Sequence, residues 1–197
     1  MFTLTPCAAG CGFPAIHGST LCASHLVNPK EEAQRIVKYI LSQKVVKDLN
    51  AQGLYFDHID FSSCFFYGCS FSGAVFTNCT FTNANMRLVF FDLSRIVSCD
   101  FSKADFQFMS LAGTTIEDSS FEGSELVHVN FGGAKITGTV FDNANLYNSR
   151  FIEAGVSRTS FNNCNLKRTN FTKCLQEELT FKSSNTAEAI YEMEELN

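Results

Sequence analysis

The chain has 197 residues, a formal net charge of −5 and 45% hydrophobic residues, with 21 Phe and no Trp. This composition is ordinary for a soluble protein, and no segment is long and apolar enough to span a membrane. The first residues also lack the charged start and apolar core of a secretion signal. We therefore expect one cytoplasmic domain with appended terminal segments.

Residues 1–27 contain three cysteines and two histidines at spacings typical of a metal knuckle. Cys7 and Cys11 form a C-x3-C pair, and Cys22 and His25 form a C-x2-H pair. These four side chains can converge on one tetrahedral Zn²⁺, with His17 as an alternative fourth ligand to His25. No Asp or Glu precedes Glu31 to serve as an acid or base. The pattern predicts a closed, structural zinc site rather than a catalytic one.

Residues 28–53 are predicted to contain a helix that ends near Asn50 to Gly53. Asn28 is a suitable N-cap, Pro29 fits the first helical position, and Glu31 fits the first turn. One face is apolar, and its residues are Ala33, Ile36, Val37, Ile40, Leu41 and Val45. This stripe is expected to cover the open end of the segment that follows; the alternative is a docking helix for a partner.

Residues 54–175 repeat with a period of five. Every fifth residue from Phe56 to Phe171 is large and apolar, without a slip of register. A small residue lies two positions before most of them, and six of the nine cysteines fall in this second column. In an extended chain, side chains two positions apart point to the same side, so both columns face inward. Small buried thiols of this kind favour a reducing compartment.

Neither a helix nor a flat strand can keep a strict period of five facing inward, but a chain that turns a corner every five residues can. Segments such as Ala84-Asn85-Met86 and Ala144-Asn145-Leu146 resemble the pattern of the pentapeptide repeat family. The resemblance implies an all-β solenoid, a right-handed quadrilateral parallel β-helix with four repeats in each coil. Residues 54–175 would then make about six coils.

Residues 176–197 are predicted to cap the solenoid with a short acidic helix. Gln176 breaks the apolar column and Phe181 briefly restores it. Asn185 and Glu188 have the spacing of a capping box, and Ala189, Ile190, Met193 and Leu196 would form the apolar side. Such a helix must dock to be stable, so it would seal the last coil or pair with a second copy as a homodimer.

Sorting the repeats by a period of twenty brings a cluster of aromatic, apolar and basic residues onto one outward face. Its members are Tyr67, Arg87, Leu88, Phe108, Val127, His128, Tyr147, Lys167 and Arg168. Aromatic and Arg side chains are enriched in protein interfaces. The cluster therefore predicts a partner-binding surface; the alternative is packing against one of the chain's own terminal segments.

The sequence shows no convincing active site. It has no Gly-rich phosphate loop and no nucleophile elbow, and His58 and His128 fall on different columns. We therefore expect a non-catalytic scaffold that binds another protein. Direct binding of nucleic acid through Arg87, Lys167 and Arg168 is disfavoured by the acidic overall charge.

A second hypothesis comes from the family resemblance. Some pentapeptide repeat proteins mimic duplex DNA, bind DNA gyrase or topoisomerase IV, and protect against quinolones. An acidic stripe opposite the aromatic cluster would fit this role; it comprises Asp57, Asp60, Asp100, Glu117, Asp118, Glu122 and Asp142. The nearly neutral solenoid, the basic residues of the cluster and the N-terminal knuckle argue against it.

Overall fold

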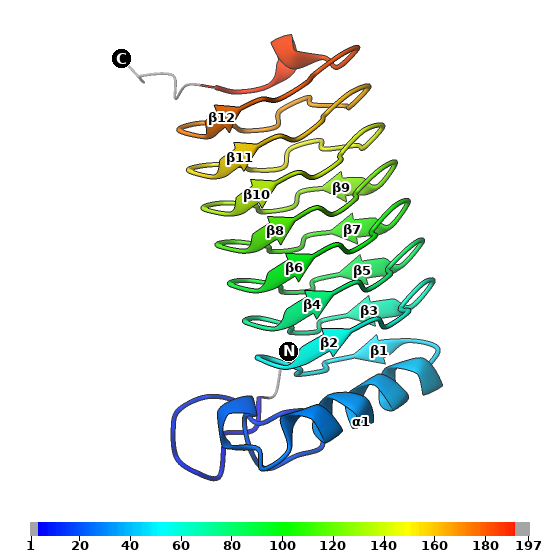
Figure 1. The fold of residues 1–197 in the computed structure, drawn as a ribbon, viewed down its shortest axis with the longest axis vertical. Coiled ribbons are helices and arrows are strands. Elements are labelled where there is room, and N and C mark those ends of the chain that lie inside the picture. Colours follow the sequence, from blue (N-terminus) through cyan, green and yellow to red (C-terminus); the bar gives the residue numbers. More distant parts are fainter. Residues whose placement is uncertain (1–3, 192–197) are drawn as a thin grey trace.

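The five-residue repeats bend the chain into coils that stack on one another. A computed structural model describes residues 4–191 (Figure 1). Each strand pairs in parallel with the strand one coil later, and the register aligns residues twenty positions apart, as in Phe56 with Phe76 and Ile96 with Ile116. Side chains of equal position therefore stack directly, as the period-twenty sorting predicts. The fold is the predicted parallel β-helix.

Two parallel sheets run along the solenoid. The first contains β1 (Val46–Lys47), β3 (Phe65–Tyr67), β5 (Asn85–Arg87), β7 (Asp105–Gln107) and β9 (Glu125–Val127). The second contains β2 (Tyr55–Asp57), β4 (Val75–Thr77), β6 (Arg95–Val97), β8 (Thr115–Glu117), β10 (Lys135–Thr137), β11 (Gly155–Ser157) and β12 (Leu175–Glu177). Beyond β9, the first sheet continues only as single bridges from Glu125 to Asn145 and on to Asn165.

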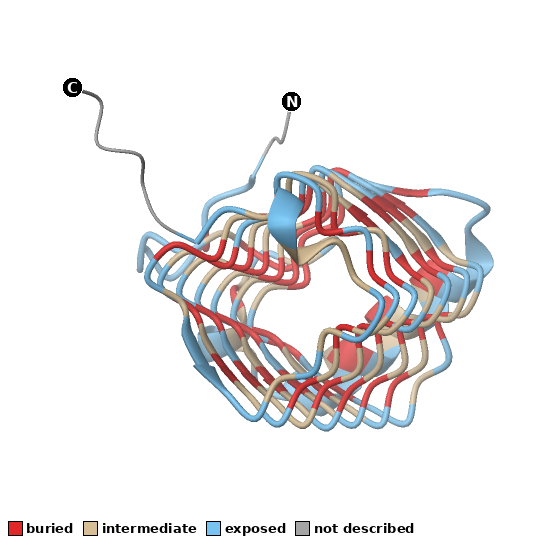
Figure 2. Cartoon of the chain, turned by 90° about the horizontal axis from the view of Figure 1, so that it is seen from above, coloured by how far each residue is buried: buried red, intermediate tan, exposed pale blue. Residues whose placement is uncertain are grey.

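The core is a column of stacked apolar side chains inside the coils. Figure 2 looks along the axis and shows buried positions recurring at the same places from coil to coil. Phe81, Phe101, Phe121 and Phe141 form one continuous stack of nearly parallel rings. All nine cysteines are unpaired, and burial raises the pKa of Cys69 and Cys164 to about 11. These two thiols are therefore core residues.

Helix α1 (Pro29–Ser42) lies across the first coil and covers its open end (Figure 1). Asn28 caps it by accepting a hydrogen bond from the Glu31 backbone N–H, and Ala33, Ile36 and Ile40 are buried in the core. Among residues 4–191, no helix has the length and apolar character needed to cross a bilayer.

The predicted end of this helix, near Asn50 to Gly53, is wrong. The helix ends at Ser42, and Val46 already belongs to the first coil, where it pairs with Phe66. Consequently Val45, which the predicted stripe included, is exposed. The reason is that Val46 and Ala51 occupy inward positions of the five-residue pattern, although Ala51 is small.

The solenoid also extends past its predicted C-terminal end, so it makes about seven turns rather than six. Gln176 of β12 pairs with Val156 of β11, because the hydrogen bonds between coils require only backbone groups. Further on, Phe181 stacks on Phe161, and Ile190 forms a bridge with Asn170.

The predicted C-terminal helix does not form within the described residues. Thr186–Glu188 makes a single 3₁₀ turn, and Asn185 uses its amide to bond the Glu188 carboxylate instead of capping a backbone N–H in its own turn. Ala189 packs against the core as part of a coil. Met193 and Leu196 lie outside the described residues, so pairing of two copies through this segment stays a prediction.

Candidate metal centre and outer-face surface

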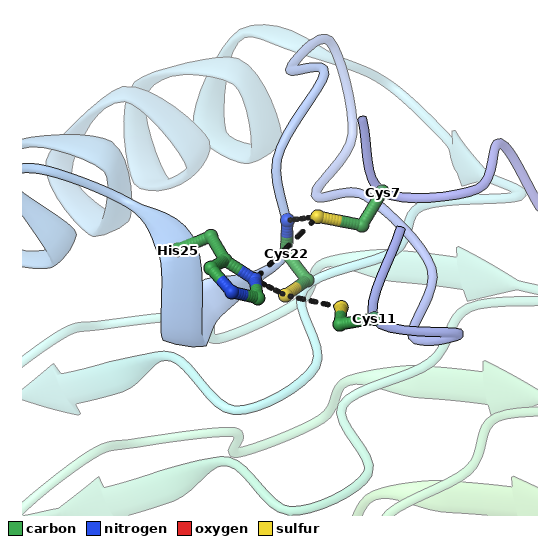
Figure 3. Close-up of side chains that lie close together, drawn as sticks. All are labelled: Cys7, Cys11, Cys22 and His25. Carbon is green, nitrogen blue, oxygen red and sulfur yellow. Dashed lines mark hydrogen bonds between the residues drawn. The ribbon is translucent and has the colours of Figure 1, made fainter. Parts of the chain in front are cut away.

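The N-terminal module brings Cys7, Cys11, Cys22 and His25 together. Their ligand atoms all lie within 4.8 Å of one another (Figure 3). Cys7 and Cys11 flank a tight turn in which Gly10 has a φ of +70°, a conformation that glycine adopts without strain. His25 is the last residue of the 3₁₀ turn η1 (Ala23–His25), and Cys22 is the residue just before this turn.

The distances between these atoms resemble the edges of a tetrahedral metal site. Around Zn²⁺, bonds of about 2.3 Å to sulfur and about 2.0 Å to nitrogen give S···S edges of about 3.8 Å and S···N edges of about 3.5 Å. Here the sulfurs of Cys11 and Cys22 are 3.6 Å apart. The His25 Nδ1 atom lies 3.7 Å from the sulfur of Cys7 and 3.3 Å from that of Cys22. The cluster can therefore bind a metal ion with four protein ligands.

Local hydrogen bonding prepares the cluster for a cation. The backbone N–H of Cys22 points at the sulfur of Cys7 at 3.3 Å. This bond is the main reason why the pKa of the Cys7 thiol falls to about 6. In contrast, burial raises the pKa of the Cys22 thiol. A thiolate at Cys7 is the form that ligates metals, and bonds to ligand sulfurs of this kind orient them.

His17, the alternative fourth ligand, lies elsewhere. Its ring packs against Tyr39 of α1 with centroids 4.6 Å apart. Its backbone N–H donates to the Asn50 carbonyl at 2.8 Å, and the Asn50 side chain donates to the Ala15 carbonyl at 2.6 Å. The module is thus attached to the first coil through buried Asn50, and the four candidate ligands lie in the same segment that makes this attachment.

The predicted partner-binding residues lie along one outer face of the solenoid, on and beside the first sheet. Tyr67, Arg87 and Val127 project from β3, β5 and β9, and the others lie in the turns that follow the strands or in the two coils beyond β9. We call the nine residues Tyr67, Arg87, Leu88, Phe108, Val127, His128, Tyr147, Lys167 and Arg168 the outer-face patch. His128 connects two of them, because it stacks on Phe108 and meets the edge of Tyr147, and it also bonds Asn148 outside the patch.

Two apolar members of the patch occupy a strained backbone conformation. Leu88 and Phe108 have φ values of +54°, in the left-handed region that costs residues with a Cβ about 1–2 kcal/mol. Most other turns of the solenoid place Gly, Asn, Ser or a charged residue at this position. Phe108 is nevertheless 50% exposed, so burial offsets only part of the cost.

Sequence reasoning missed three residues of the same face. Phe65, Asp105 and Glu125 lie one position before the inward column, on β3, β7 and β9, and Phe65 is exposed. Asp105 and Glu125 border a hollow of about 280 Å³, lined also by Gln107, Phe108, Val127 and His128. Applying the period-twenty sorting to the position before the inward column would have found them.

Most carboxylates of the opposite acidic stripe have structural partners. Asp57 bonds His58 and Thr77, and Glu117 pairs with Arg95. Asp60 and Asp100 accept the backbone N–H two residues later in their own turns, and Asp142 accepts that of Asn162 in the next coil, which stabilises these turns. The stripe is thus partly neutralised and partly committed to the fold.

The architecture and the repeat define a parallel β-solenoid built from five-residue units. The sequence model of the pentapeptide repeats matches residues 55–92, 99–138, 124–161 and 139–175. The chain belongs to the pentapeptide repeat family. No curated protein was found to be similar to it in sequence.

Several solved structures share features of this fold. A trypsin-treated form of QnrB1, a plasmid-mediated fluoroquinolone resistance protein, is 20% identical with a TM-score of 0.41, covering 75% of this chain and 89% of its own. HetL, from the cyanobacterium Nostoc sp. strain PCC 7120 and involved in heterocyst differentiation regulation, is 12% identical with a TM-score of 0.35, covering 81% and 96%. A pentapeptide repeat protein of the Arabidopsis thaliana thylakoid lumen is 24% identical with a TM-score of 0.38, covering 59% and 67%. Similarities this low do not indicate what this chain binds.

Proposed function

We propose that this chain is a non-catalytic scaffold that binds another protein through the outer-face patch. The observation that carries the proposal is Phe108, a large apolar side chain that is half exposed and held in a left-handed conformation. The left-handed conformation recurs at the turns throughout the solenoid, so what distinguishes Phe108 is a large aromatic side chain, left half exposed beside other aromatic and basic residues, where most turns carry a small or polar one. Tyr67 and Arg87 provide the residue types on which protein interfaces depend most.

The test compares two substitutions that make the same change on different faces. Phe108→Asn replaces the exposed apolar residue with one that tolerates a left-handed backbone. Leu93→Asn makes the matching change elsewhere, since Leu93 has a φ of +59° and is 76% exposed but lies outside the patch. Partners would be captured by cross-linking from host cells and then measured with purified components.

We expect Phe108→Asn to weaken the complex about tenfold or more, as for a central interface aromatic, and Leu93→Asn to leave it unchanged. Because Asn suits both turns, the loss could not be attributed to unfolding. If both variants bind the purified partner like the wild type, the patch is not the interface.

Within this proposal, Zn²⁺ has a structural role. Cys7, Cys11, Cys22 and His25 provide four ligands, which leaves no position for a substrate or a reactive water. The bound ion would fix the N-terminal module against Asn50 and the first coil. The nine free cysteines are consistent with a reducing compartment, which supports the cytoplasm as the location.

The alternative function is mimicry of DNA toward gyrase or topoisomerase IV. The acidic stripe favours it, but Glu117 is paired with Arg95, which reduces the exposed negative charge, and Asp57 is hydrogen-bonded by Thr77. A supercoiling assay with purified gyrase, with and without a quinolone, tests the alternative directly. Inhibition or protection that survives Phe108→Asn and is lost on neutralising the stripe would favour mimicry over the scaffold.

A further inference from the structure

The hollow above β7 and β9 combines negative charge with aromatic surface. The register pairs Asp105 of β7 with Glu125 of β9, so the two carboxylates project from adjacent strands. Phe108 and His128, from the turns after these strands, form one wall with rings stacked 5.2 Å apart and 5° from parallel. The hollow is therefore an open site with two acids at one side and flat rings at the other.

The two acids are held in place by neutral groups alone. Asp105 accepts from the amides of Asn85 and Gln107, and Glu125 accepts from the amide of Asn145 at 2.7 Å. Among residues 4–191, neither carboxylate belongs to an ion pair, although Glu117, Glu153 and Glu188 each have one. Like charges directly opposite each other in a sheet are destabilising. A cation from outside the chain would remove that cost.

The shape of the hollow selects among cations. A guanidinium is planar, carries five N–H donors in a fixed fork, and stacks on aromatic faces. It can donate to both carboxylates while its plane lies along the rings of Phe108 or His128. An ammonium group lacks the flat surface, and Ca²⁺ requires six to eight oxygen ligands.

We infer that the partner protein binds this face with an arginine side chain, whose guanidinium enters the hollow between Asp105, Glu125 and the Phe108–His128 pair. This inference rests on the proposed function and specifies the chemistry of the partner.

The first experiment titrates the isotope-labelled full chain with N-acetyl-arginine amide and follows backbone amide NMR signals. We expect shifts confined to Gln107, Phe108, Val127, His128 and their neighbours. The neutral isostere N-acetyl-citrulline amide and N-acetyl-lysine amide should give much smaller shifts. Equal shifts with citrulline, or shifts centred elsewhere, would overturn the inference.

A double variant tests the carboxylates. Asp105→Asn with Glu125→Gln keeps the size and one acceptor oxygen of each side chain and removes the charge, and both side chains lie on the surface, so the fold is retained. The matched control is Glu122→Gln with Asp142→Asn, two acids at equivalent positions of successive coils on another face. We expect the first pair to weaken arginine binding about tenfold or more and the control pair to leave it unchanged. Equal losses would mean that only the net charge matters, which contradicts the inference.

The same variants separate this inference from the proposed function. If Phe108→Asn disrupts the complex with the purified partner but the Asp105/Glu125 variant does not, the patch is the interface and the arginine inference is wrong. If Phe108→Asn has no effect on the complex, both are wrong. If both variants disrupt it and one arginine-to-citrulline replacement in a partner peptide does the same, both hold.

Discussion

The ring of Phe101 lies flat on the ring of Phe81, one coil earlier, with centroids 4.6 Å apart and planes 5° from parallel. On its other side Phe101 meets Phe121 in the same way, at 4.8 Å. Each core ring is thus shared between neighbouring coils. The stability of the solenoid is consequently a sum of contacts between adjacent coils.

Phe101→Ala should lower the free energy of unfolding by about 3–5 kcal/mol, because it leaves a cavity between two rings that cannot close on each other. Urea denaturation followed by circular dichroism measures the change. Phe101→Leu is the control and should cost less, since it fills most of the space. A loss below about 1 kcal/mol for the Ala variant would show that the coils relax around the gap.

Leu93→Asn should stabilise the protein by about 0.5–1 kcal/mol, because it relieves the left-handed strain of an exposed apolar residue. Thermal unfolding checks this. Leu93→Ala removes the same side chain but keeps a residue unsuited to positive φ, so it should give no comparable gain. A stabilised Ala variant would instead attribute the effect to lost exposed apolar surface.

Zinc should copurify with the chain in a ratio of about one ion per molecule. Cys11→Ser should lose most of the metal, whereas Cys174→Ser, a thiol of the solenoid, should retain it. Elemental analysis measures the content. Removal of the metal by a chelator should lower the melting temperature of the wild type, because folding of a small metal module depends on its ion. Metal-free wild type, or equal loss in both variants, would exclude the site.

Acid should destabilise the fold partly through Asp60. Hydrogen bonds from Ser62, through its side chain and its backbone N–H, lower the pKa of this carboxyl below its ordinary value of 3.8. Its stabilising contribution is therefore complete above that value and is lost as the pH falls through the lowered, folded-state pKa.

Asp60→Asn keeps the acceptor oxygen but cannot titrate. Between about pH 5 and about pH 2 it should lose less stability than the wild type in urea denaturation. Asp60→Ala removes the acceptor as well and should be weaker at both ends of the range. Identical pH profiles for the wild type and the Asn variant would exclude a contribution from Asp60.

The repeat was predictable from the sequence because its signal is redundant. The same apolar class recurs at every fifth position along the solenoid, so single exceptions do not hide the period. Both ends were harder to predict, since there a position can stay in register without a large apolar side chain. Ala51 and Gln176 are such positions, and backbone hydrogen bonds between coils hold them in place.

The candidate sites were predictable to different degrees. Cys7, Cys11, Cys22 and His25 lie close together in the sequence, so the short segments between them keep their ligand atoms close together in space. The sequence left His17 as an alternative because the packing of its ring on Tyr39 depends on where α1 lies. Asp105 and Glu125 were missed because a column of mixed Asn, Asp and Glu looks like ordinary surface until the strands place the two acids side by side.

The cap formed by the N-terminal module and α1 precedes every coil in the chain, and each coil closes on the one made just before it. Closing a coil joins residues only twenty positions apart, as Val46 with Phe66, so each step costs little chain entropy. During synthesis, each new coil can pair with the backbone N–H and C=O groups at the exposed edge of the coil before it. The solenoid can thus fold during translation, coil by coil, starting from the end capped by α1.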